Sequence, residues 1–97
     1  MGDNNIIELE FDKTISALAG NDYGYVHYKK QIENKFDYNK RNIIIFPEQV
    51  KKVAISFVQG MFRDILKKIG KSEIERYVTI KSSSEKLTEK IISYIKF

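Results

Sequence analysis

The chain contains no cysteine and no tryptophan, and it has one proline and one histidine. Without cysteine it has no disulfide, no thiolate metal ligand and no cysteine nucleophile. The single histidine, His27, is too little for an ordinary zinc site, and no nucleophile elbow accompanies it. We therefore expect no catalytic residues, no metal site and no cofactor, and we predict that the protein is not an enzyme.

Long hydrophobic runs are also missing. No apolar stretch approaches the ~20 residues that a membrane-spanning helix needs, and the first residues show no basic region followed by an apolar run. We expect a cytoplasmic protein that does not enter a membrane. Apolar residues make up 42% and charged residues 31% of the chain, which is typical of a folded domain. We expect residues 1–97 to form one domain.

The charge is moderately basic. The formal net charge is +4, and lysine supplies fourteen of the 17 basic residues. Proteins that read nucleic acid tend to use arginine, whose planar fork donates two hydrogen bonds at once. The charge is therefore only a weak indication of a nucleic-acid partner.

Segments with the apolar spacing of a strand and segments with that of a helix follow one another along the chain, and this order predicts an α/β fold. Strands are expected over 5–11, 43–46 and 77–81, and residues 14–19 form either a short strand or one turn of helix. Helices are expected over 22–36 and 56–69, and a last helix carries an apolar face near the carboxyl end. The order β(β)-α-β-α-β-α indicates a mixed sheet partly covered by helices. The continuous apolar run 43–46 predicts a central strand covered on both faces.

Residues Gly70-Lys71-Ser72 match the end of a phosphate-binding P-loop. That motif needs a glycine five positions before Gly70, where Ile65 stands, and it should follow a strand rather than a helix. The end of one helix and the start of the next, with an S-x-x-E capping box from Ser72, is the favoured interpretation.

Ser56 stands at the start of the long predicted helix. With Gln59 it forms an S-x-x-Q pattern, which predicts a capping box that satisfies free backbone amides. The alternative is a phosphorylation site, because a phosphate there would meet the positive end of the helix. Gly60, inside the same helix, predicts a close approach of the helix to the sheet, and Asp22 is the expected cap of the preceding helix.

The chain resembles a known family over about residues 5–95, and the most specific part of the resemblance lies in residues 43–70. The strand Ile43–Phe46 is followed by Ile55-Ser56-Phe57, Met61-Phe62, Leu66 and Gly70, with a glycine turn at 20–24 before it and the strand 77–80 after it. This pattern resembles the STAS-like domain of unknown function, a bacterial group related to the STAS domains of anti-sigma-factor antagonists. By spacing, the phosphorylated serine of the antagonists falls at Ile55 and their acidic residue at Ala54.

The resemblance implies a small α/β fold and a role in protein–protein regulation. It also implies that the helix beginning near the serine docks onto a partner such as a kinase-like ATP-binding regulator. The residues expected on this surface are Lys51, Lys52, Ser56, Gln59 and Arg63.

The leading hypothesis is thus a non-enzymatic regulatory module that binds another protein. A nucleic-acid-associated accessory protein and a small nucleotide-binding protein are the alternatives. An exposed edge strand would also allow a dimer.

Overall fold

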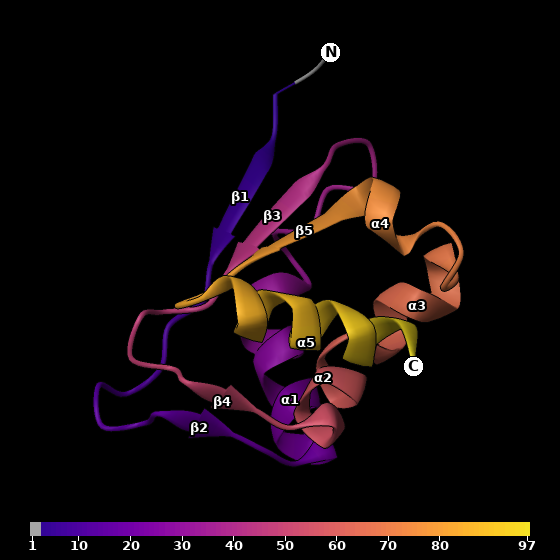
Figure 1. Cartoon of the computed structure of the whole chain (residues 1–97). Helices are drawn as coiled ribbons and strands as arrows, with labels where there is room; N and C mark the ends of the chain where they lie inside the picture. Colours follow the sequence, from indigo (N-terminus) through magenta and orange to yellow (C-terminus); the bar gives the residue numbers. More distant parts are fainter. Residues whose placement is uncertain (1–2) are drawn as a thin grey trace.

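The computed structural model describes residues 3–97, and its centre is a three-stranded parallel sheet. The strands are β1 (Asn5–Glu8), β3 (Asn42–Ile45) and β5 (Val78–Lys81), in the order β1-β3-β5. Both pairings are parallel (Figure 1). The prediction of an α/β fold is confirmed. The expected mixed sheet is wrong, because every strand pair in residues 3–97 is parallel.

A second, two-stranded parallel sheet joins β2 (Ala17–Leu18) to β4 (Lys52–Val53). Of the two structures expected for residues 14–19, the short strand is the one observed. Backbone amides of Lys52 and Ala54 donate to the carbonyl oxygens of Ser16 and Leu18 at 3.2 and 2.8 Å, which fixes the register.

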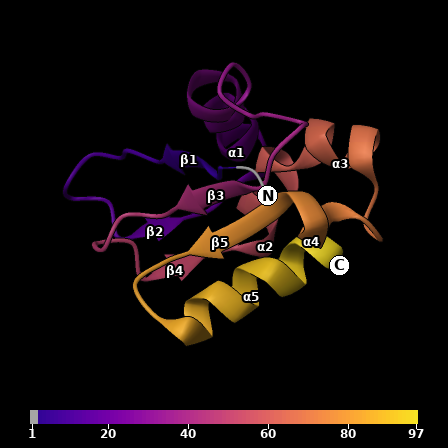
Figure 2. The same cartoon turned by 90° about the horizontal axis from the view of Figure 1, so that it is seen from above.

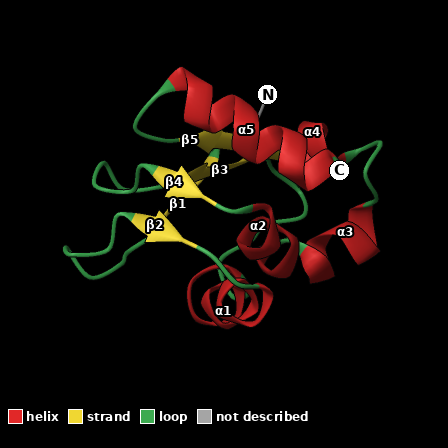
Figure 3. Cartoon of the chain, turned by 60° about the horizontal axis from the view of Figure 1, so that its bottom comes forward, coloured by secondary structure: helices red, strands yellow, loops and turns green. Residues whose placement is uncertain are grey.

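The first two thirds of the chain consist of two similar units. The first runs β1, β2, α1 (Asn21–His27), and the second runs β3, β4, α2 (Ile55–Met61). Each element packs against its counterpart: β1 pairs with β3, β2 with β4, and α1 lies against α2. A third unit follows, in which β5 leads to α5 (Glu85–Lys96) with no strand assigned between them (Figure 3).

The two longest expected helices are each divided. The helix expected over 22–36 is α1 followed by a π-helical segment, η1 (Tyr28–Ile32), and residues 33–36 are not helical. The helix expected over 56–69 begins at Ile55 and breaks at Phe62, where φ is −101° and ψ is 6°, before α3 (Arg63–Ile69). The short turn expected after Gly70 is α4 (Ile74–Tyr77). In residues 3–97, no helix is both long enough and apolar enough to cross a membrane.

Helices α1 and α2 touch through two glycines. A Cβ atom on Gly60 would lie 1.9 Å from the Asn21 carbonyl oxygen, and one on Gly24 would lie 2.1 Å from the Phe57 carbonyl oxygen. Gly60 therefore does permit a close approach, but its neighbour is α1. The expected approach to the sheet is wrong.

The main sheet is buried on one face only. Side chains of Ile7, Ile44 and Ile80 enter the core, with at most 4% of their surface exposed. On the opposite face Ile6 is 59% exposed, and Ile43 and Ile45 are only half-buried. Figure 2 views this face with β2, β4 and α2 behind the strands. Residues 43–45 do belong to the central strand, which spans Asn42–Ile45, but the expectation that both its faces are covered is wrong.

Candidate functional site

A groove of about 500 Å³ lies between the two-stranded sheet and the first turns of α5. We call it the β4–α5 groove. Its lining comes from three distant parts of the chain, which are residues 17–19, residues 51–54, and Ser84, Lys86, Leu87, Lys90 and Tyr94.

Small side chains on the strands keep this groove open. Side chains alternate between the faces of a strand, so Leu18 and Val53 point to one face and are buried. The other face carries Ala17, Ala19 and Ala54, together with the exposed Lys52. The three alanines, together with Leu18, Val53 and Leu87, give the groove an apolar floor.

The outer edge of β4 also faces this groove. Backbone amides of Lys52 and Ala54 bond to the β2 side, so alternation directs the amide and carbonyl of Val53 to the opposite edge. In the main sheet β5 adds a third strand beside β3, whereas no strand within residues 3–97 takes that place beside β4 in the smaller sheet. Figure 3 shows α5 on the side of β4 away from β2, and residues of both elements line the groove.

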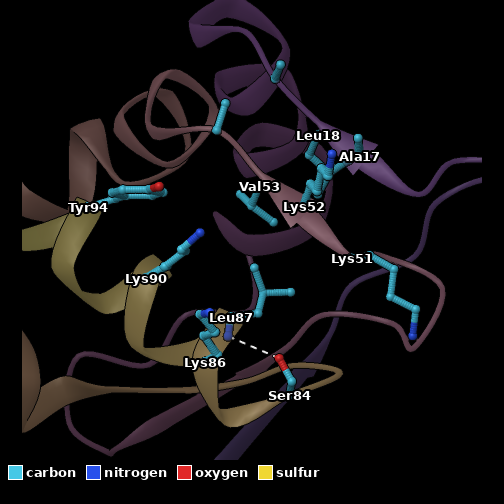
Figure 4. Close-up of a pocket in the computed structure, with 12 residues that line it drawn as sticks. Ala17, Leu18, Lys51, Lys52, Val53, Ser84, Lys86, Leu87, Lys90 and Tyr94 are labelled. Atoms are coloured by element: carbon cyan, nitrogen blue, oxygen red, sulfur yellow. Dashed lines mark hydrogen bonds between the residues drawn. The ribbon is translucent and has the colours of Figure 1, made fainter.

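The rim of the groove is positively charged. Lys51 and Lys52 come from the strand side, and Lys86 and Lys90 come from successive turns of α5. No carboxylate lines the groove, and the ion pairs found within residues 3–97 use other lysines. Figure 4 shows Lys90 reaching from α5 toward the strands and Lys51 extending away from the other labelled side chains.

The amino end of α5 is fixed beside the groove. The Ser84 side-chain oxygen accepts a hydrogen bond from the Leu87 amide at 3.1 Å, which caps the helix. The cap holds Lys86 and Lys90 in register along one side of α5, because residues four apart lie on the same helix face.

The five residues expected to form one partner surface are divided among separate places. Lys51 and Lys52 line the groove. Gln59 lines a smaller depression of about 180 Å³ beside Tyr94 and Phe97. The Arg63 guanidinium lies 4.4 Å from the centre of the Tyr25 ring and donates to the Asn21 side-chain oxygen.

Ser56 does not cap α2 in the expected way. The helix begins at Ile55 after Ala54, and no side chain caps it. The Ser56 Oγ atom accepts a hydrogen bond from the Gly20 amide at 3.0 Å, so it ties the helix to the turn before α1. The capping box with Gln59 is wrong. The capping roles expected for Asp22 and Ser72 are wrong as well, because α1 and α4 also start without a side-chain cap.

His27 packs between aromatic side chains. Its ring lies 4.7 Å from the ring centres of both Phe11 and Tyr23. Burial lowers the pKa of His27, and the nearby Lys30 charge lowers it further. The imidazole is therefore neutral at pH 7, with Nδ1 2.8 Å from the Gln31 amide nitrogen.

The helix side of the groove was missed in the sequence because its residues lie thirty or more positions from the strand side. The only local signal was the pair Lys86 and Lys90, four apart beside the apolar positions Leu87 and Ile91. Within residues 3–97, no group of three histidine, cysteine or acidic side chains lies close enough to hold a metal ion.

Comparisons with protein-family models, with curated proteins and with solved structures found no match for this chain.

Proposed function

We propose that this protein is a non-enzymatic interaction module, STAS-like in type, that binds an extended acidic segment of a partner protein in the β4–α5 groove. The observation that carries the proposal is the open edge of β4 beside four lysines and an apolar floor. The α/β order and the resemblance of residues 43–70 support the STAS-like type. Residence in the cytoplasm and a kinase-like regulator as the partner remain parts of this proposal.

The shape and charge of the groove favour a peptide. An extended chain added beside β4 would pair with the amide and carbonyl of Val53, which is how sheets commonly recruit a partner strand. Acidic side chains on that segment would then meet Lys52, Lys86 and Lys90.

The same lining is less suited to nucleic acid. Surfaces for single strands combine cationic grooves with several aromatic platforms on which bases stack. Among the residues that the structure describes, Tyr94 is the one aromatic residue along the groove, and no arginine lines it. The alanine floor offers apolar contact without a stacking surface.

The test measures binding of a fluorescent peptide in which valine and glutamate alternate over ten residues. We expect saturable binding that weakens with salt, and at least tenfold weaker binding by the double variant Lys86→Glu/Lys90→Glu. A peptide of the same length and charge, in which proline replaces every valine, should bind poorly, because proline cannot supply the amide that pairs with a strand edge.

The matched control is Lys35→Glu/Lys67→Glu, which changes the net charge equally with both side chains exposed and away from the groove. It should change the affinity less than about threefold, as expected for screened charges. Equal losses in both double variants would mean unspecific attraction and would refute the groove. Tighter binding of a single-stranded DNA of equal charge would instead favour the nucleic-acid alternative.

A further inference from the structure

The uncovered face of the main sheet is a second surface, separate from the β4–α5 groove. All-parallel sheets are normally covered on both faces, because the connections between their strands place helices there. Here the helices gather on the face that carries Ile7 and Ile44, and Figure 2 shows no described helix in front of the other face. Ile6, with 59% of its surface exposed, belongs to this uncovered face.

The side chains on this face form two rows across the three strands. The register places Ile6, Ile43 and Thr79 in one row. The next row is Glu8, Ile45 and Lys81, so it reads acidic, apolar, basic. Glu8 and Lys81 are exposed and lie two strand spacings apart, about 10 Å, and the ion pairs found within residues 3–97 do not join them.

A two-fold axis parallel to β3 would bring each of these charges opposite a charge of the other sign on a second chain. Rotation about such an axis keeps the strand direction and exchanges the two edges of the sheet. Glu8 then lies opposite the partner's Lys81, and Lys81 lies opposite the partner's Glu8. Ile43 and Ile45 meet their own counterparts at the axis, as an isologous interface requires.

We infer that this face binds a second copy of the chain, with the two sheets stacked face to face and two Glu8–Lys81 pairs across the interface. The other axis in the plane, perpendicular to the strands, would place Glu8 opposite the apolar row and leave both charges unpaired. The observed charge order therefore selects one of the two symmetric arrangements. The Arg41 charge does not disturb this arrangement. Its guanidinium is held at the β5 side, where it donates to the Thr79 hydroxyl and the Glu75 carbonyl.

The face is small, and its size sets the strength of association. Three strands with two outward rows offer less than the ~800 Å² per partner of a standard interface. We expect a reversible dimer that forms between about 10 μM and 1 mM, since small interfaces give weak complexes. The two ion pairs should make association weaken as salt is raised.

The test is sedimentation equilibrium of the full chain from low micromolar to millimolar concentration. Glu8→Lys alone and Lys81→Glu alone should each weaken self-association at least tenfold, since each change creates two like-charge contacts. An equimolar mixture of the two variants should associate as well as the wild-type protein, because each charge then meets its opposite. The double variant Glu8→Lys/Lys81→Glu should also recover.

Circular dichroism of each variant provides the check on folding, and both side chains are exposed. The groove variant Lys86→Glu/Lys90→Glu should dimerise normally, which separates this inference from the proposed function. A wild-type protein that stays monomeric at 1 mM overturns the inference. So does association that neither single variant weakens, or a mixture that does not recover.

Discussion

Replacing Gly60 with alanine tests the contact that joins the two similar units. The new Cβ atom would lie 1.9 Å from the Asn21 carbonyl oxygen and 2.8 Å from the carbonyl carbon. Ordinary contacts begin near 3.4 Å, so α1 and α2 would have to separate by about 1.5 Å. Both obstacles are backbone atoms, which cannot turn aside as a flexible side chain can.

Two opposing effects set the size of the change. Alanine favours a helix over glycine by about 1 kcal/mol. Overpacking of this kind costs about 1 to 3 kcal/mol and occasionally more, and an obstructing backbone belongs at the upper end. We expect Gly60→Ala to lower the free energy of unfolding by about 2 kcal/mol, which for a domain of this size lowers Tm by roughly 8 to 16 °C.

Urea titration followed by circular dichroism measures this loss. Gln59→Ala is the control, since it gives the same helix an alanine at an exposed neighbouring position. Gly24→Ala makes a similar clash with Phe57, and once the helices have separated the second alanine should cost little. A stabilised Gly60→Ala protein, as helix propensity alone predicts, would refute the reasoning.

Three further predictions follow from single residues. Ser56→Ala should lower stability by about 1 kcal/mol in urea titration, because the Gly20 amide loses its acceptor. Gln59→Ala should change the free energy of unfolding by less than about 0.5 kcal/mol. A loss as large as that of Ser56→Ala would instead support the capping box. Asn42→Leu should cost about 3 kcal/mol or more, since this fully buried amide bonds to four other residues, and a loss below about 1 kcal/mol would contradict its structural role. Because burial lowers the pKa of His27 below 6.5, the unfolded chain takes up that proton at higher pH than the folded protein. Stability should therefore be full above about pH 7 and fall as the pH drops below 6.5, and His27→Gln should flatten this decline, which urea midpoints across the range would show.

The repeating apolar pattern made most of the secondary structure predictable. Period-two and helical spacing depend on burial of one face, and burial is what placed Ile7, Ile44 and Ile80 in the core. Local sequence patterns gave the wrong hydrogen-bond partner where a group distant in the sequence took that bond instead. The Ser56 hydroxyl accepts from Gly20, which lies 36 positions away, instead of bonding within its own helix.

Asn42 shows the same limit in a polar stretch. It lies just before the strand expected over 43–46, yet it begins β3 and is fully buried. Its carboxamide bonds to the side chain of Asn5 and to backbone atoms of Asp37, Lys40 and Tyr77. No pattern near residue 42 indicates these partners, because the fold brings them together.

Both proposed surfaces have one structural origin. The third unit supplies β5 and α5 without a strand beside β4, and the helices gather on one face of the main sheet. The lack of a strand beside β4 leaves an open strand edge in the β4–α5 groove. The gathering of the helices on one face leaves the face with Ile6, Ile43 and Ile45 uncovered. The two surfaces share no residue, so a stacked dimer would keep both grooves free. Such a dimer presents two copies of a weak site, and a partner with two acidic segments would bind it more tightly than either groove alone, provided its linker spans them.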